Sequence, residues 1–191
     1  MAIGPKSERI DMADLDLVVR GIYTDEAGTA YSGTGVSSTA AEIDRVADVS
    51  ARLVAAGGTL SATVAAHDGK IIALDTAAGS VVTLPASSGS GATFRFLVTV
   101  TATSNSHIIQ VANATDEMRG FVIQDSDTAT APNTWWAADN DDTITLNRTT
   151  SGLAAQGEYF ELVDAVSGVW FVRGYSQASG TEITPFSNAV S

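Results

Sequence analysis

The chain has 191 residues, with 10 Lys and Arg against 22 Asp and Glu, so its formal net charge is −12 and its isoelectric point is near 4.3. It contains no Cys, which excludes disulfides, zinc–thiolate sites and iron–sulfur clusters. Because an acidic surface repels phosphate and no run of about 18 apolar residues is present, we expect neither nucleic-acid binding nor a membrane span.

Residues 1–36 are interpreted as an extended arm with one short strand near residues 16–22. The arm has a single apolar run, and no helical or strand period persists long enough to build a core. A tail that stays in solvent gains no stabilisation from an apolar run, so docking on a partner is favoured over a free terminus. The candidate docking residues are Leu15, Leu17, Val18, Val19 and Ile22.

Residues 37–58 are predicted to form a short helix, extending from Thr39 to Ala56. Thr39 and Glu42 have the spacing of a capping box, and Gly57-Gly58 follows as a helix stop. One heptad seam runs along this helix, and it consists of Ile43, Val46, Ser50 and Leu53. A seam this short is not stable alone, so it either packs on the following domain or associates with copies of itself, as in a homotrimer.

Residues 59–176 are predicted to form an antiparallel β-sandwich or barrel, so the fold class is mainly β. Short apolar runs alternate with polar positions, and turn signals separate them. Two clear cases are residues 94–100 and 159–163, where every second side chain is expected to face the core. No segment of helix length separates the runs, which argues against a parallel βαβ sheet. The tail, residues 177–191, is expected to be an edge strand or a second docking strap.

The sequence contains no constellation that points to catalysis, a metal or a cofactor. Asp139-Asn140-Asp141-Asp142 lacks the Gly and Glu positions of a helix-loop-helix calcium loop and is interpreted as a turn. His67 and His107 have no second His or Cys at ligand spacing, so we expect structural roles for both. We therefore expect a protein that is not an enzyme and has no cofactor.

Trp135 and Trp136 lie in a loop-like stretch and form the only candidate ligand platform. Adjacent residues in a strand point to opposite faces, so one ring can be buried while the other is exposed. An exposed Trp beside Asn and Asp is typical of both sugar platforms and protein interfaces. Packing of both rings under a loop is the third interpretation.

Residues 35–44, Gly-Val-Ser-Ser-Thr-Ala-Ala-Glu-Ile-Asp, resemble a segment that precedes the β-domain in many structural proteins of tailed bacteriophages. The stretch from Gly69 to Pro85 is similar to the start of a β-domain in phage head-decoration and fibre-like proteins. The similarity continues through residues 91–96, 104–109 and 111–116, and it covers about two thirds of the chain. The resemblance implies a virion structural protein, trimeric, on the outer capsid surface.

The function we expect is that of a capsid decoration, or cement, protein. Its partners would be the major capsid protein and further copies of itself, and its arm would cross the joints between capsid subunits. A head- or tail-fibre adhesin that binds host glycans through Trp135 or Trp136 is the alternative. A depolymerase is the third class, and it would require a carboxylate pair that the sequence does not single out.

Overall fold

The computed structural model of the chain describes residues 22–24, 30–32, 52–127, 131–153 and 155–190. The chain divides into two units, Met1–Val49 and Ser50–Ser191. In the first unit the described residues form an antiparallel pair of strands, β1 (Ile22–Thr24) and β2 (Ala30–Ser32), with Tyr23 opposite Tyr31. The predicted arm otherwise lies outside the described residues.

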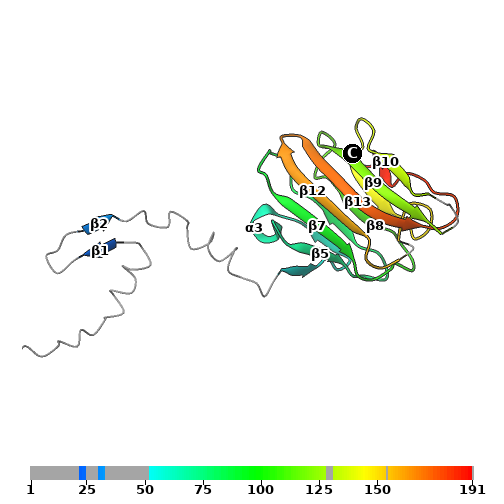
Figure 1. Cartoon of the computed structure of the whole chain (residues 1–191), viewed down its shortest axis with the longest axis horizontal. Helices are drawn as coiled ribbons and strands as arrows, with labels where there is room; N and C mark the ends of the chain where they lie inside the picture. Colours follow the sequence, from blue (N-terminus) through cyan, green and yellow to red (C-terminus); the bar gives the residue numbers. More distant parts are fainter. Residues whose placement is uncertain (1–21, 25–29, 33–51, 128–130, 154, 191) are drawn as a thin grey trace, which may run out of the picture. The chain divides into compact units, whose positions relative to one another are not determined.

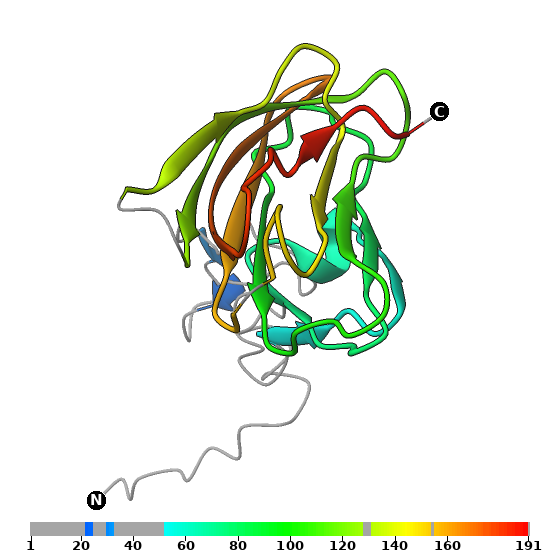
Figure 2. The same ribbon diagram turned by 90° about the vertical axis from the view of Figure 1, so that its right-hand side faces the viewer.

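The second unit is built from two β-sheets, which confirms the mainly-β prediction. One sheet has seven strands in the order β10-β9-β13-β12-β7-β5-β3, and the other has five in the order β14-β11-β8-β6-β4. Figure 1 looks onto the seven-stranded sheet, and Figure 2 shows the two sheets as layers of a sandwich. The strands of the seven-stranded sheet are β3 (Leu53–Ala55), β5 (Ile71–Leu74), β7 (Thr93–Val98), β9 (Glu117–Ser126), β10 (Asn133–Trp136), β12 (Tyr159–Val166) and β13 (Val169–Ala178). Those of the five-stranded sheet are β4 (Thr59–Ser61), β6 (Val81–Thr83), β8 (His107–Gln110), β11 (Thr143–Leu146) and β14 (Phe186–Ser187).

The first six of these strands alternate between the two sheets, and this path makes their pairs parallel. The chain passes from β3 to β4, from β5 to β6 and from β7 to β8, so β3, β5 and β7 stack in one sheet and β4, β6 and β8 in the other. Parallel neighbours need a crossover, and here a strand of the opposite sheet supplies it in place of a helix. The sequence predicted an antiparallel β-sandwich or barrel; in the structure the pairs among β3 to β8 that link strands of one sheet, and the pair β9–β13, are parallel instead. The remaining strand pairs of the domain are antiparallel.

The core lies between the sheets and follows the predicted alternation. In β7 the side chains of Phe94, Phe96 and Val98 are buried while their neighbours are half-buried, and in β12 Phe160 and Leu162 are buried. The Phe94 and Trp170 rings meet edge to face with centroids 5.5 Å apart. Large aromatic side chains thus fill the centre of the sandwich.

The predicted helix was wrong at its C-terminal end. Leu53–Ala55 is strand β3, paired in parallel with β5, while residues 37–51 lie outside the described residues. The short helix of the described domain is α3 (Val64–His67), which follows strand β4. Thr63 caps it, because its hydroxyl accepts a hydrogen bond from the Ala66 amide at 3.3 Å.

The C-terminal segment includes an edge strand, which is one of the two predicted alternatives. β13 continues to Ala178, two residues past the predicted domain boundary, and β14 then pairs with β11. Phe186 is buried, so this end of the chain belongs to the core.

Candidate binding surface

The outer face of the seven-stranded sheet carries many apolar side chains. Residues paired across a sheet share a face, so the strand register defines rows across it. The first row is Trp136, Phe121, Arg173, Glu161, Arg95, Ile71 and Leu53. The second is Thr134, Ile123, Tyr175, Tyr159, Leu97, Ala73 and Ala55, and the third is Arg119, Phe171, Val163 and Thr93. We call these three rows the outer face.

Most of the large apolar side chains that the described domain exposes lie on this face. Their exposed fractions are 68% for Trp136, 58% for Leu53, 44% for Phe171, 43% for Tyr175 and 39% for Ile123. Among the described residues, only Val166 and Ile183 are exposed apolar side chains of this size elsewhere. A contiguous exposed apolar patch marks an interaction site in soluble proteins.

The two adjacent Trp side chains lie on opposite faces of strand β10, not in a loop. Trp135 points inward, packs against the core and donates its indole N–H to Gln124 Oε1 at 2.8 Å. Trp136 points outward and rests against Phe121, with ring centroids 5.0 Å apart and an interplanar angle of 47°. Only Trp136 is therefore placed to meet a ligand or a partner.

Two of the three cations of the outer face, Arg119 and Arg173, are paired with carboxylates, which lowers the net charge of the face. Arg173 Nε donates to Glu161 Oε1 at 2.8 Å, and Arg119 donates to Glu117 at 2.9 and 3.0 Å and also to Asp139. Arg95 donates to the carbonyl of Gly69. Three of the five Lys and Arg residues after position 56 lie on this face, in a region with thirteen Asp and Glu.

Two tyrosines on the outer face are neutral at physiological pH. Burial, together with the negative charge of Asp125, raises the pKa of Tyr175, whose hydroxyl lies 3.5 Å from Asp125 Oδ2. Burial also raises the pKa of Tyr159, and the negative charge of Glu161 raises it further. Neither phenol therefore adds negative charge to the face.

Asp164 is a buried carboxylate with many hydrogen bonds, and its partners belong to the β6–β7 loop. It is 1% exposed and accepts hydrogen bonds from the backbone amides of Ser88, Gly89 and Ser90 at 2.8–3.2 Å. The hydroxyls of Ser87 and Ser90 donate to it at 2.8 and 2.7 Å. Burial alone would raise the pKa of Asp164, but these hydrogen bonds outweigh it and hold the pKa well below its ordinary value of 3.8. The carboxylate fixes the β6–β7 loop to β12.

The acidic cluster at residues 139–142 forms a turn, as the sequence suggested. Asp141 Oδ2 accepts the amide of Ala138 at 2.7 Å, and Asn140 has a φ of 67°. Asp142 is buried and accepts the amides of Ala189 and Val190 at 2.8 and 3.2 Å, which ties the C-terminal end to β11. Within the described residues, no group of three or more His, Asp or Glu could hold a metal ion.

Both histidines bond to the backbone. His67, at the end of α3, accepts the Thr63 amide through Nδ1 at 3.0 Å. His107 is 1% exposed; its Nδ1 accepts the Ser80 amide at 2.9 Å, so the proton lies on Nε2, which donates to the Val100 carbonyl at 2.9 Å. Burial lowers the pKa of His107, although the hydrogen bond to Val100 and the charge of Asp75 act against it.

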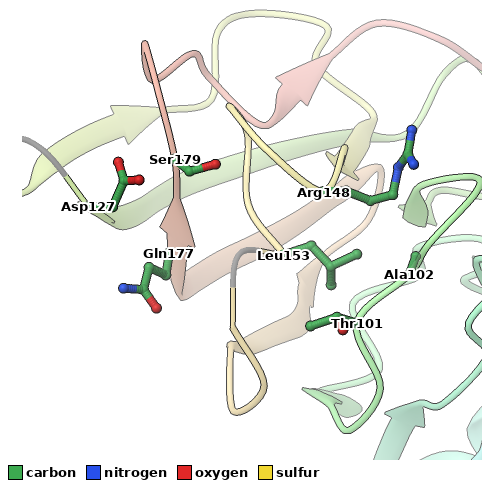
Figure 3. A pocket seen from close by; sticks show the side chains of 7 residues that line it. All are labelled: Thr101, Ala102, Asp127, Arg148, Leu153, Gln177 and Ser179. Atoms are coloured by element: carbon green, nitrogen blue, oxygen red, sulfur yellow. The ribbon is translucent and has the colours of Figure 1, made fainter.

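Two shallow hollows flank Arg148 at one end of the sandwich. One of about 430 Å³ is lined by Thr101, Ala102, Asp127, Arg148, Leu153, Gln177 and Ser179, and the other, of about 510 Å³, lies by Gly79 and Asn105. In Figure 3 the Arg148 guanidinium points away from the Asp127 carboxylate, and Leu153 lies between them in the view. Arg148 Nη1 donates to the Thr103 carbonyl at 2.9 Å. These polar groups do not converge on one point, so the hollows do not form a built site.

The residues predicted for self-association and capsid docking are only partly described. Ile43, Val46 and Ser50 lie outside the described residues, as do Leu15, Leu17, Val18 and Val19. Ile22 lies in β1, opposite Ser32. Leu53 lies in β3 at the end of the first row of the outer face, and not on a helical seam.

The part of the chain that the structure describes has no helix long and apolar enough to cross a membrane.

Sequence reasoning missed Phe121, Ile123, Phe171 and Tyr175. A signal was present, because strands β9 and β13 carry apolar residues at both odd and even positions. A strand that carries apolar side chains on both faces of its sheet is either covered on both faces or leaves one apolar face exposed.

Comparison of the chain with protein-family models, with curated proteins and with solved structures finds no match.

Proposed function

We propose that this chain is an oligomeric virion structural protein that binds the outer surface of a phage capsid and strengthens contacts between major capsid subunits. The observation that carries the proposal is the outer face, a broad and nearly neutral surface of aromatic, aliphatic and Arg side chains. Such a composition is typical of protein interfaces, where Trp, Tyr and Arg supply most of the binding free energy. The protein acts by binding and not by catalysis.

Two resemblances support the location on the virion: residues 35–44 resemble a segment of phage structural proteins, and residues 69–85, 91–96, 104–109 and 111–116 resemble phage head-decoration and fibre-like proteins. The described domain also has features that suit a component of a particle. Its loops are fixed to the core by buried carboxylates, and both ends of its chain from β3 to β14 lie in sheets. A domain of this kind can transmit a mechanical force between neighbouring subunits of a particle without local unfolding.

The proposed mechanism is the sharing of binding free energy between subunits. The apolar run at Leu15, Leu17, Val18 and Val19 docks on major capsid subunits, while the β-domains hold the copies together. Several arms joined in one oligomer raise the effective concentration of each arm at its site, so avidity exceeds the affinity of one arm.

Binding of the purified chain to particles that lack it tests this function. We expect the wild type to saturate the particles and to raise their disruption temperature. A Leu17→Asp/Val19→Asp chain should bind weakly, and Ile183→Asp, an exposed apolar position outside the arm and the outer face, should bind like the wild type. Normal occupancy without the two arm side chains would contradict docking by the arm, and no binding by the wild type would contradict the function.

The second candidate is an adhesin that binds host glycans, and the exposed ring of Trp136 favours it. The indole rests on Phe121 and is 68% exposed, so one face of a sugar ring can stack on it. Glycan binding that disappears in Trp136→Ala and persists in Ile183→Ala would support this candidate. Absence of binding to host-surface glycans would remove it.

A further inference from the structure

The size of the outer face matches what a stable contact between two proteins requires. The seven strands lie about 4.8 Å apart and rise about 3.3 Å per residue, and they range from three residues in β3 to ten in β9 and β13. Their combined length gives an area of about 700 Å², close to the ~800 Å² that each partner buries in a standard interface. The apolar anchors are spread over it from Trp136 at one edge to Leu53 at the other.

The charge of the outer face separates it from the rest of the domain. Residues 57–191 have a net charge of −8, so two copies repel each other over most of their surfaces. The three rows of the outer face contain Arg95, Arg119, Arg173 and Glu161, and the carboxylates of Glu117, Asp125 and Asp139 border them, so positive and negative charges nearly balance there. When two identical faces meet, every charged group is present twice, so like-charge repulsion is small only where the positive and negative charges of the face nearly balance.

The arrangement of charges inside the face also suits a copy of itself. Arg173 is 72% exposed in its side chain and stands among Phe121, Phe171 and Tyr175, its neighbours across and along the strands. Arg173 therefore lies beside three aromatic residues on the same face, and its guanidinium has Glu161 as carboxylate partner. When two faces meet, each Arg–Glu pair can bond to its counterpart, and the aromatic rings around it exclude water.

We propose that the outer face of the seven-stranded sheet binds the same face of a second copy of this chain. The inference rests on the proposed assembly function, because it names the partner of the surface that carries that function. The contact is a face-to-face packing of two sheets, related by a two-fold axis. Phe171, Tyr175 and Trp136 are its anchors.

Sedimentation of the full chain, without any capsid, tests the proposal. We expect the wild type to form dimers or larger assemblies at micromolar concentration. Phe171→Arg and Tyr175→Arg should each raise the dissociation constant by a factor of about 10 or more, because an unpaired charge is buried. Both positions are more than 40% exposed in the single chain, so the variants should keep the circular dichroism spectrum of the wild type.

Two control variants separate this contact from other modes of association. Ile183→Arg changes an equally exposed apolar residue off the face, and it should leave the dissociation constant unchanged. Val46→Glu changes the predicted helix seam. A wild type that stays monomeric up to about 100 µM would overturn the proposal. So would an assembly that Val46→Glu abolishes and that neither face variant weakens.

A mixing experiment tests whether the two faces are identical. A labelled Phe171→Arg chain should bind the wild type more weakly than labelled wild type does, because one face of the pair is damaged. Binding with wild-type affinity would mean that the outer face meets a different surface of the second copy, which would also overturn the proposal. Weakened assembly of the face variants together with failure of the wild type to bind particles would reject the capsid function alone.

Discussion

Single buried polar residues hold the loops of this domain in place. A Ser-rich loop encloses Asp164 and donates hydrogen bonds from backbone amides and hydroxyls to both of its oxygens. Asp142 likewise accepts a backbone amide from the C-terminal end of the chain. Each carboxylate lies more than 40 residues from the amides that it binds. These long-range contacts explain how loops rich in Ser and Gly keep one conformation, since such loops have little tendency to order by themselves.

Asp164→Asn should destabilise the protein by about 3 kcal/mol or more, because the amide nitrogen would face donors that the carboxylate now satisfies. The free energy of unfolding in urea measures the effect. Asp139→Asn is the control, since the Asp139 side chain is 83% exposed, and it should cause a much smaller change. Equal losses in the two variants would mean that the loop does not depend on Asp164.

Stability should decrease as the pH falls below about 6.5, partly because of His107. Burial lowers the pKa of His107 in the folded state, so the unfolded state binds the proton more tightly. The stability that neutral His107 contributes is therefore lost as the pH falls from 6.5 toward the lowered pKa. The slope from one such group is at most about 1.4 kcal/mol per pH unit. Urea unfolding between pH 7.5 and 5 should show a smaller slope for His107→Gln than for the wild type. Identical slopes would exclude His107 as the source.

At the scale of elements, the parallel pair β9–β13 is the longest contact of the seven-stranded sheet. Its ten residue pairs place Phe121 beside Arg173 and Ile123 beside Tyr175, so this register builds a third of the outer face. Gly120 makes the close approach possible. It has a φ of 133°, and a Cβ at this position would lie 1.9 Å from the Val172 carbonyl oxygen.

Gly120→Ala should therefore prevent the native pairing of β9 with β13. We expect a loss of stability greater than about 3 kcal/mol or an insoluble protein, because a backbone atom, and not a flexible side chain, blocks the new methyl group. Gly168→Ala is the matched control: Gly168 has a φ of 82° and open space around it, so only the backbone strain of about 1–2 kcal/mol applies. Thermal unfolding of both variants gives the comparison, and a Gly120→Ala protein as stable as the control would contradict the account.

At the scale of the whole molecule, the net charge of −12 opposes every contact between copies. The outer face reduces this repulsion locally but does not remove the charge of the remaining surface. Association through an apolar, charge-balanced face should therefore respond to salt in the opposite direction from binding that depends on opposite charges.

Raising NaCl from about 20 mM to about 500 mM should tighten the association of copies, because the Debye length falls from about 20 Å to about 4 Å and screens their mutual repulsion. The dissociation constant from sedimentation equilibrium measures this effect. Phe171→Arg should remain weaker than the wild type at both salt concentrations. Association that weakens as salt is added would indicate a contact held by opposite charges.

Local pattern in the sequence was enough to determine the class of the fold and much of its core. Period-two alternation identified Phe94, Phe96, Phe160 and Leu162 as core residues, and turn chemistry identified the role of residues 139–142. It left open whether the two adjacent Trp residues would have different environments. These features depend on contacts between near neighbours, so they can be read without knowing how strands pair.

The tertiary structure alone decided which sheet each strand joins and which apolar side chains remain outside. Leu53 fits a helical seam as well as a strand, and it is in a strand because β5 offers it a parallel partner. The outer face forms because β9, β13 and β12 lie side by side, although β10 and β11 separate β9 from β12 in the chain. The physical reason is that sheet register is set by hydrogen bonds between distant segments, and these leave no period in the local sequence.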